Sequence, residues 1–146
     1  MTFEKRQSAG YLANHLARLF AHALQRRLKP LGLGTAQFMA LIELWAEEGL
    51  TQRQLVERLD VEQATMANTL ARMERDGLIR RSPHPDDARA QQVWLTARAR
   101  RLRDPASAAA EAVNAEALAS LSAEERAAFL GLLRSVVDRL RDLRDG

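Results

Sequence analysis

The sequence predicts a mainly α protein with one small β element, and three observations support this α+β class. Apolar residues recur at three- and four-residue steps over most of the chain, which is typical of amphipathic helices. Between Leu78 and Leu95 the pattern changes to two strand-length segments around a turn with two prolines. With 146 residues, 47% of them hydrophobic and 28% charged, the chain has the composition of a folded soluble protein and can bury a core.

The first third of the chain predicts two helices separated by a turn. The repeat from Leu12 to Leu28 indicates an amphipathic helix. The segment from Lys29 to Gly34 contains the proline and glycines that interrupt such a pattern. We expect Thr35 to cap a second helix that runs from Ala36 to about Glu48. Its buried side is expected to carry Phe38, Leu41, Ile42 and Trp45.

A helix-turn-helix is predicted over about residues 51–76. The segment Thr51-Gln52-Arg53-Gln54 has the Thr-x-x-Gln form of a capping box, in which side chains satisfy the backbone donors of the first turn. A tight turn at Asp60-Val61-Glu62 then leads into a fourth helix that ends at Asp76-Gly77. Glu62 is a poor residue for the N-cap of that helix. Its buried stripe is expected to comprise Ala64, Ala67, Leu70 and Met73.

A β-hairpin with a polar tip follows directly, over about residues 78–95. Its strands are predicted at residues 78–82 and 91–95, and the eight residues between them include two prolines. Thr96 is expected to cap a fifth helix that continues to about Ala119. Pro105 lies inside this helix, which predicts a kink or a break near Arg103.

The C-terminal helix begins at a Ser-x-x-Glu capping box, Ser122 to Glu125, and carries an apolar seam from Phe129 to Leu143. The terminal helices together hold more apolar surface than one small core can cover, so a second copy of the chain is the simplest cover. The alternative is that these helices fold back on their own domain. We therefore expect a helical dimerisation region at residues 1–33 and 104–146, and a winged helix-turn-helix domain at residues 34–103.

The charge distribution and the lack of cysteine narrow the possible functions. The chain holds 22 basic and 19 acidic residues, for a net charge of +3. Residues 49–103 carry +4 and residues 104–146 carry −3, so the helix-turn-helix and hairpin form the basic part. The absence of cysteine excludes disulfides and thiolate chemistry. Neither a secretory signal nor an apolar run long enough to span a membrane is apparent, and we expect a cytoplasmic protein without membrane contact.

A basic helix-turn-helix followed by a basic hairpin is typical of a protein that binds double-stranded DNA. Polar side chains on the outer face of the fourth helix can contact base edges or phosphates, because Gln and Asn suit adenine, Arg suits guanine, and Thr suits phosphate or a thymine methyl. Hairpin arginines can reach phosphates or the minor groove. Asp87 is expected to orient Arg89. The predicted DNA-binding residues are Thr51, Gln52, Gln63, Thr65, Asn68, Thr69, Arg72, Arg80, Arg81, Asp87 and Arg89.

An enzyme is not predicted, because no phosphate-cradling glycine loop, no Gly-x-Ser-x-Gly and no His-Glu-x-x-His pattern occurs. Glu47-Glu48 is interpreted as solvated charge at a helix end. No cofactor is expected. No metal site is expected either, because His15 and His22 lie two helical turns apart. The alternative function is an effector-independent winged-helix module for DNA architecture or protein interaction.

These residues resemble the MarR family of bacterial winged-helix regulators. Asp86 to Thr96 is similar to the wing motif of that family, Asp-x-Arg followed by Val-x-Leu-Thr, and Leu70 to Ile79 resembles the exit from the recognition helix. The resemblance implies a homodimer that binds a palindromic operator, usually as a repressor released by a small aromatic or phenolic ligand. Ala88 departs from the second Arg of many members, and the absence of cysteine excludes the peroxide-sensing branch.

The resemblance also places an effector pocket between the dimerisation helices and the winged domain. An aromatic acid would require an apolar slot and one cation, which His15, Arg18 or His22 could supply. The same apolar residues are equally consistent with ordinary core packing. The candidate ligand-binding residues are His15, Arg18, Leu19, Phe20, Phe38, Leu41 and Trp45.

Overall fold

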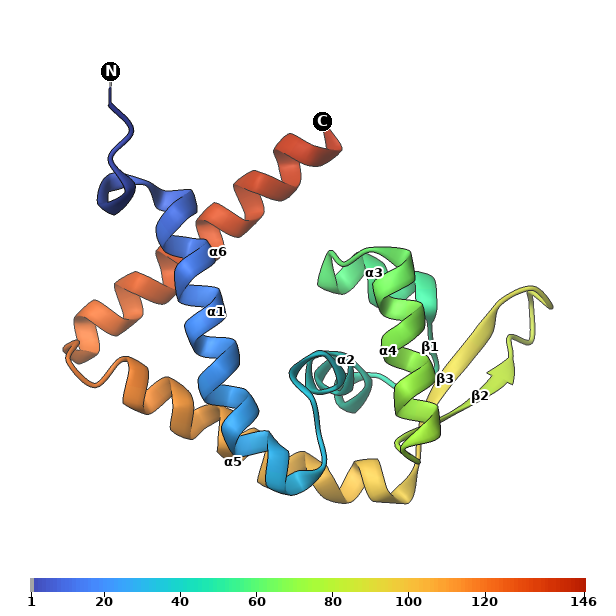
Figure 1. The fold of residues 1–146 in the computed structure, drawn as a ribbon. Coiled ribbons are helices and arrows are strands. Elements are labelled where there is room, and N and C mark those ends of the chain that lie inside the picture. Colours follow the sequence, from blue (N-terminus) through green and yellow to red (C-terminus); the bar gives the residue numbers. More distant parts are fainter. Residues whose placement is uncertain (1) are drawn as a thin grey trace. The chain divides into compact units, whose positions relative to one another are not determined.

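The computed structural model describes residues 2–146 and contains six α-helices, two short 3-10 helices and one small sheet within that range (Figure 1). The chain forms two compact units, residues 2–111 and Ala112–Gly146. The elements in chain order are η1 (Lys5–Gln7), α1 (Ala9–Leu28), η2 (Lys29–Leu31), α2 (Thr35–Ala46), β1 (Leu50–Thr51), α3 (Gln52–Leu59), α4 (Gln63–Arg75), β2 (Ile79–Pro83), β3 (Gln91–Leu95), α5 (Ala97–Ala117) and α6 (Ala123–Asp145).

Helices α1 and α2 occur where the sequence predicts them, with a difference at the second N-terminus. Ser8 caps α1 by accepting a hydrogen bond from the backbone N–H of Tyr11. Helix α2 begins one residue early, and its N-cap is Gly34 rather than Thr35. The reason is that the Gln37 side chain accepts the Gly34 N–H at 2.9 Å and so satisfies this end of the helix without a threonine hydroxyl.

The predicted capping box of α3 is confirmed. The Thr51 N–H donates to Gln54 Oε1 at 2.8 Å, and the Gln54 N–H donates to Thr51 Oγ1 at 3.2 Å. The predicted buried stripe of α4 is partly wrong, because Ala64 is exposed whereas Met66, Thr69, Leu70 and Met73 are buried. The buried face of α4 is therefore rotated from the predicted one. Methionine contributes more apolar area to the core than alanine does, which favours this orientation.

The sheet has one strand more than the sequence predicts. Its order is β1-β3-β2, with both pairs antiparallel, and the hairpin β2–β3 extends beyond α4 (Figure 1). β1 has only two residues and pairs through Leu50 with Val93, so no local sequence pattern predicts this strand. Gly49, just before β1, has φ +83°, and a Cβ there would lie 3.0 Å from the Trp94 ring.

Helix α5 begins as predicted, but it contains no break at Pro105. Thr96 Oγ1 accepts the Ala99 N–H at 3.2 Å and caps the helix, which then runs without interruption to Ala117. The Pro105 side chain is exposed, whereas Ala99 and Ala106 are fully buried. Tertiary packing on the buried face holds the two halves in one helix, although proline removes one backbone donor.

The core of the first unit gathers the buried faces of the helices and of the sheet. Residues with no exposed surface include Leu28 of α1, Leu41 of α2, Leu55 of α3 and Leu70 of α4. β2 and β3 contribute Ile79, Val93 and Leu95, and α5 adds its buried alanines. Ile42, predicted inside, is exposed on α2, because its side of the helix is turned away from this core.

Helix α6 differs from the other α-helices because none of its residues is buried. Its predicted capping box is confirmed, since Ser122 and Glu125 exchange hydrogen bonds of 2.9 and 3.1 Å. The contact with Ser122 holds the pKa of the Glu125 carboxyl below its usual range. Large apolar side chains of α6 are 39% to 66% exposed, and we call them the α6 seam: Leu130, Leu132, Leu133, Val136, Val137, Leu140 and Leu143.

Candidate nucleic-acid interface

The outer face of α4 presents polar side chains to solvent. Thr65, Asn68 and Arg72 are exposed and lie three and four residues apart, so they share one face of the helix. Met66, Leu70 and Met73 hold the opposite face in the core. Gln63, the first residue of α4, is also exposed. The structure thus places four of the five polar residues predicted on this helix at the surface.

Thr69 is the exception, and the prediction that it faces outward is wrong. Its side chain is only 8% exposed, and its hydroxyl donates to the Thr65 carbonyl oxygen at 2.9 Å. A threonine can be buried in a helix when its hydroxyl bonds to the carbonyl four residues earlier, because no donor then stays unsatisfied. Thr69 therefore belongs to the packing of α4 and not to its polar face.

A groove of about 700 Å³ separates the N-terminus of α3 from the hairpin. Thr51 and Gln52 line one wall, whereas Arg81, Asp87 and Arg89 line the other. The groove brings five of the sequence-predicted residues together. The Thr51 hydroxyl is held in its capping box, and the Gln52 amide donates to Gln63 across to α4.

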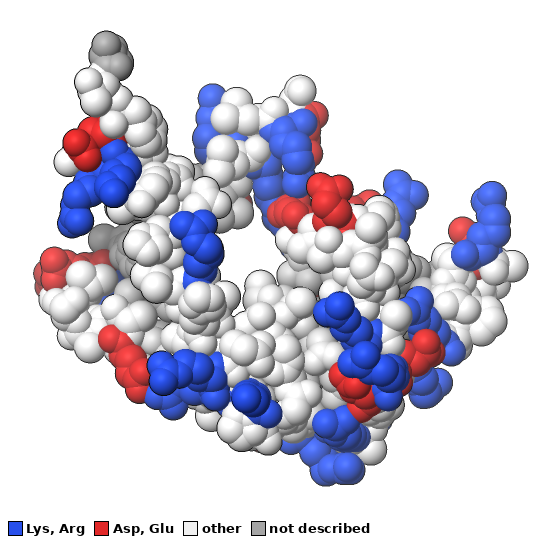
Figure 2. Space-filling model, viewed as in Figure 1, with Lys and Arg blue, Asp and Glu red and all other residues white. Residues whose placement is uncertain are grey.

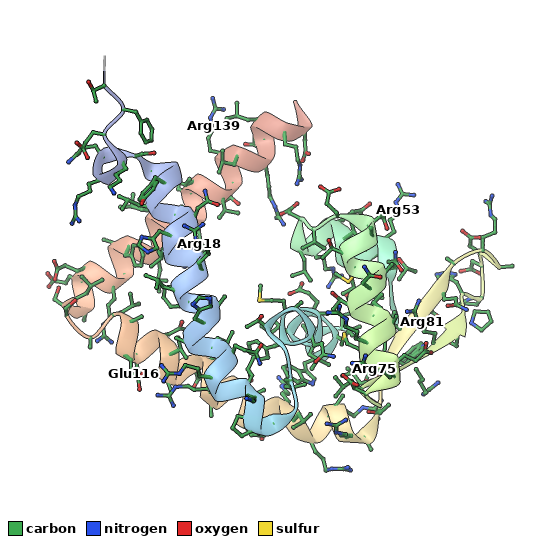
Figure 3. The ribbon with its side chains drawn as sticks, viewed as in Figure 1. Arg18, Arg53, Arg75, Arg81, Glu116 and Arg139 are labelled. Atoms are coloured by element: carbon green, nitrogen blue, oxygen red, sulfur yellow. The ribbon has the colours of Figure 1, made fainter. Side chains whose placement is uncertain are left out.

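The three hairpin arginines have different surroundings. Arg89 at the tip has a side chain that is 95% exposed, and the Asp87 carboxylate accepts the Arg89 backbone N–H at 3.0 Å. Arg89 Nε lies 3.6 Å from the same carboxylate oxygen, which is the contact expected from the sequence. Arg81 is half-buried beside α4, with its Nε 3.8 Å from Glu74 Oε1 (Figure 3). Arg80 is exposed on β2. The tip arginine is thus far more accessible than Arg81, whose side chain is 22% exposed.

Glu48 stabilises the base of the hairpin, a role that the interpretation as solvated charge missed. Its Oε1 accepts the Leu95 N–H of β3 at 2.9 Å, and both carboxylate oxygens accept hydrogen bonds from the Arg100 guanidinium. The Arg100 hydrogen bonds hold the pKa of this carboxyl below its usual range. The partners lie 47 and 52 residues from Glu48, so the sequence carries no local signal for them.

Asp76 joins the C-terminus of α4 to two other helices. Gln37 of α2 donates to Asp76 Oδ2 at 2.9 Å, and Arg98 of α5 donates to the Asp76 carbonyl oxygen. The Arg75 hydrogen bond, followed by that from Gln37, lowers the pKa of the Asp76 carboxyl. Gln37 is only 8% exposed, so its amide replaces water as the partner of this carboxylate. The orientation of α4 is therefore fixed at its C-terminal end.

The candidate ligand-binding residues do not form one cluster. Phe38 and Leu41 are buried in the core. Trp45 packs edge-to-face on Phe38, with ring centroids 5.9 Å apart, and its Nε1 donates to the Ala99 carbonyl oxygen. These three residues have structural roles in the part of the first unit that spans residues 34–103, which we call the winged unit. His15, Arg18 and Leu19 are exposed on α1, and Phe20 is half-buried.

Charge over the interface is mixed. Figure 2 shows basic side chains, which are arginines in this part of the sequence, around the lower part of α4 and over the hairpin, with acidic side chains between them. Arg53 at the start of α3 pairs with Glu57 of the same helix at 3.2 Å (Figure 3). Among residues 2–146, no group of histidine and carboxylate side chains could hold a metal ion. Within the same range no helix is long and apolar enough to cross a bilayer.

A helix-turn-helix with an exposed polar helix, followed by an arginine-tipped hairpin, defines the winged helix-turn-helix class of DNA-binding proteins. The sequence matches the MarR family over residues 33–90. It is 35% identical over 124 residues to the transcriptional regulator HosA of Escherichia coli O111:H-, covering 85% of this chain and 87% of HosA. The chain belongs to the MarR family and is a DNA-binding transcriptional regulator.

Solved structures agree with this assignment. The Bordetella bronchiseptica regulator BpsR, described with regulation of its DNA binding by 6-hydroxynicotinic acid, has a TM-score of 0.86 and 25% identity, covering 94% of this chain and 99% of BpsR. A mutant form of Escherichia coli MarR in complex with operator DNA has a TM-score of 0.81 and 26% identity, covering 87% of this chain and 91% of that one. Both are similar to this chain over nearly its whole length.

Proposed function

We propose that the protein is a ligand-responsive repressor that binds a palindromic operator as a homodimer in the cytoplasm. The observation that carries this proposal is that the polar face of α4 and the wing arginine, Arg89, are both exposed. The MarR mutant solved with operator DNA supports it, because that protein shares this fold. The recognition surface consists of Gln63, Thr65, Asn68 and Arg72 on α4, Thr51 and Gln52 on α3, and Arg80, Arg81, Asp87 and Arg89 on the wing.

In this proposal α4 reads bases and the wing contacts the DNA backbone. Asn68 and Arg72 reach base edges in the major groove, where Asn suits adenine and Arg suits guanine. Arg89 reaches a phosphate or the adjacent minor groove, and Asp87 fixes the backbone of the tip. In a dimer the two recognition helices meet half-sites about 34 Å apart, one turn of DNA.

The dimerisation region comprises residues 1–33 and 104–146, and the winged domain comprises residues 34–103. The α6 seam supports this division, because seven large apolar side chains on one helix are costly to leave in water. The apolar residues Leu12, Leu16 and Leu19 of α1 are exposed as well. A second copy of the chain would cover such surfaces with identical ones, as a two-fold interface requires.

The effector is a small aromatic or phenolic acid. BpsR supports this class, since 6-hydroxynicotinic acid has an aromatic ring and a carboxylate. Because Phe38, Leu41 and Trp45 are committed to the core, the ligand is expected to contact α1, where His15, Arg18 and Leu19 share one exposed face. The half-buried Phe20 lies on another side of the same helix. Its binding would favour a dimer whose recognition helices are spaced wrongly for consecutive major grooves.

The test is selection of bound sequences from a random DNA library with the purified full chain. The proposal predicts an inverted repeat, and affinity that falls with salt with a log–log slope of about −0.9 per neutralised phosphate. Arg89→Ala should weaken binding to all sequences about equally and reduce the slope by about one per protomer. Arg72→Ala should instead relax the preference at particular base pairs. A library that yields no common sequence would overturn the proposal.

Release is tested separately with benzoic, hydroxybenzoic and 6-hydroxynicotinic acids. A member of this panel should lower operator affinity in a fluorescence anisotropy titration, and Arg18→Gln should weaken that response without changing affinity in the absence of acid. If none of the acids changes operator affinity, the aromatic effector is excluded while DNA binding stands.

A further inference from the structure

Two glutamines connect the helix-turn-helix at the N-terminal ends of its helices. Gln52 is the first residue of α3 and Gln63 is the first residue of α4. The Gln52 Nε2 donates to Gln63 Oε1 at 3.2 Å, and it also lies 3.5 Å from the Gln63 carbonyl oxygen. One amide of α3 therefore contacts both the side chain and the backbone of the residue that begins the recognition helix.

The N-terminus of α4 has no side-chain cap of its own, unlike the N-termini of α3 and α6. Helices α3 and α6 begin at capping boxes, in which side chains satisfy backbone donors. In α4 the N-cap Glu62 makes no side-chain capping hydrogen bond. The Gln52 bond is thus a tertiary restraint at a helix end that lacks a local one.

The restraint determines which atom of the Gln63 amide faces outward. The last torsion of a glutamine is broad and nearly two-fold, so a free side chain presents oxygen or nitrogen with similar ease. Gln52 presents its Nε2 and not its Oε1, because the same nitrogen lies 3.5 Å from the Gln63 carbonyl oxygen and the opposite rotamer would set two oxygens against each other. Gln63 can accept this donor only through Oε1. Rotation of the amide by half a turn would place two NH₂ groups against each other. The Gln63 Nε2 is therefore held on the side away from Gln52.

We propose that Gln52 is a positioning residue that fixes the Gln63 amide for reading adenine, a role that rests on the proposed function of α4 as recognition helix. With this orientation Nε2 donates to adenine N7, and the second lone pair of Oε1 accepts from the adenine N6 amino group. Guanine presents acceptors at both positions, so its O6 would oppose Oε1. Gln52 thereby converts an ambiguous amide into one that discriminates between the two purines.

The experiment repeats the library selection with full-length variants and then measures affinities for the selected site with adenine or guanine at the Gln63 position. The wild-type protein is expected to favour adenine by about tenfold or more, within the range of one good bidentate contact. Gln52→Ala should reduce that ratio to less than about threefold, because the amide can then rotate. Gln63→Ala should abolish the ratio, and Gln52→Ala should then change it no further.

For a second variant we expect a changed base preference and not the loss of a preference. In Gln52→Glu the carboxylate accepts from Gln63 Nε2, which turns Oε1 outward, so selection should shift toward a base that donates, such as cytosine through its N4 amino group. The matched control is Arg53→Ala, which alters an exposed neighbour on α3 that pairs within its own helix. Any effect of Arg53→Ala should act through phosphates and be equal for all sequences, so every base preference should stay unchanged.

The alternative outcomes are distinguishable. If the wild-type protein selects no sequence, the proposed function is wrong. The role of Gln52 in positioning Gln63 is then wrong as well. If the wild-type protein selects an operator but Gln52→Ala and Gln52→Glu retain its preference at every position, the positioning role alone is overturned. Circular dichroism and size exclusion confirm that each variant is folded, which is expected because the Gln52–Gln63 contact is at the surface.

Discussion

The winged unit buries its large apolar core residues, whereas helix α6 leaves its large apolar residues exposed. The winged unit buries Leu41, Leu70 and Val93 with at most 1% of their surface exposed. All seven residues of the α6 seam are more than a third exposed. The winged unit also connects its elements through buried or half-buried polar contacts, such as Gln37 with Asp76 and Glu48 with Leu95. The difference indicates that the winged unit covers its large apolar core residues with its own chain. The apolar side chains of α6 stay exposed unless another surface covers them.

The largest expected effect comes from a charge placed on the α6 seam. Leu140→Glu would bury an unpaired carboxylate in the proposed dimer interface, so the dimer should dissociate and operator affinity should fall by about 100-fold or more. Light scattering measures the mass, and anisotropy measures the affinity. Ser135→Glu is the control, because it lies about 140° around the same helix and should leave both unchanged. A fully dimeric Leu140→Glu protein would show that the seam is not the interface.

A core substitution should act on folding instead. Leu70 is fully buried where α4 packs on the core, and Leu70→Ala is expected to cost about 2–5 kcal/mol of unfolding free energy. Arg72→Ala, exposed on the same helix, should change it by less than about 0.5 kcal/mol. Urea denaturation at equal protein concentrations compares the two variants. A cost below about 1 kcal/mol for Leu70→Ala would contradict the assignment of this face to the core.

The smallest expected effect is on the free energy of unfolding at acidic pH. The Arg100 hydrogen bonds lower the pKa of Glu48 below its ordinary 4.5, so the folded state binds this proton less readily than the unfolded state. The stabilisation is present above that ordinary value and is lost as pH falls through the lowered pKa of the folded state. Glu48→Gln should remove this part of the pH dependence. Urea denaturation from about pH 6 to about pH 3 tests it, and equal pH dependence in both proteins would exclude the effect.

Local patterns predict much of this fold, and contacts between distant residues account for what they miss. The capping boxes at Thr51 and Ser122 are readable because each is complete within four residues. β1 and the Glu48–Arg100 pair depend on partners more than forty residues away. The predicted stripe of α4 is right for Leu70 and Met73 but wrong at its start, because only the tertiary core determines that Met66 and not Ala64 is buried.

In the candidate site, too, local patterns predict some features, and packing between elements determines the others. Thr65, Asn68 and Arg72 are exposed as their polar character predicts, whereas Thr69 is buried because its hydroxyl is satisfied within the helix. The contact of Asp87 with Arg89 spans two residues, and the sequence could therefore anticipate it. The polar character of Gln52 and Gln63 predicts a place near DNA for each, but their hydrogen bond depends on how α3 packs on α4.

In the proposed dimer two winged units, joined by their helical regions, read one inverted repeat. Sedimentation velocity on the protein with its selected operator tests this arrangement most directly, because the mass of the complex counts the chains. Two chains are expected on the full inverted repeat, and an isolated half-site should bind more weakly by at least about tenfold. One chain per operator, with a half-site bound as tightly as the full repeat, would contradict this arrangement.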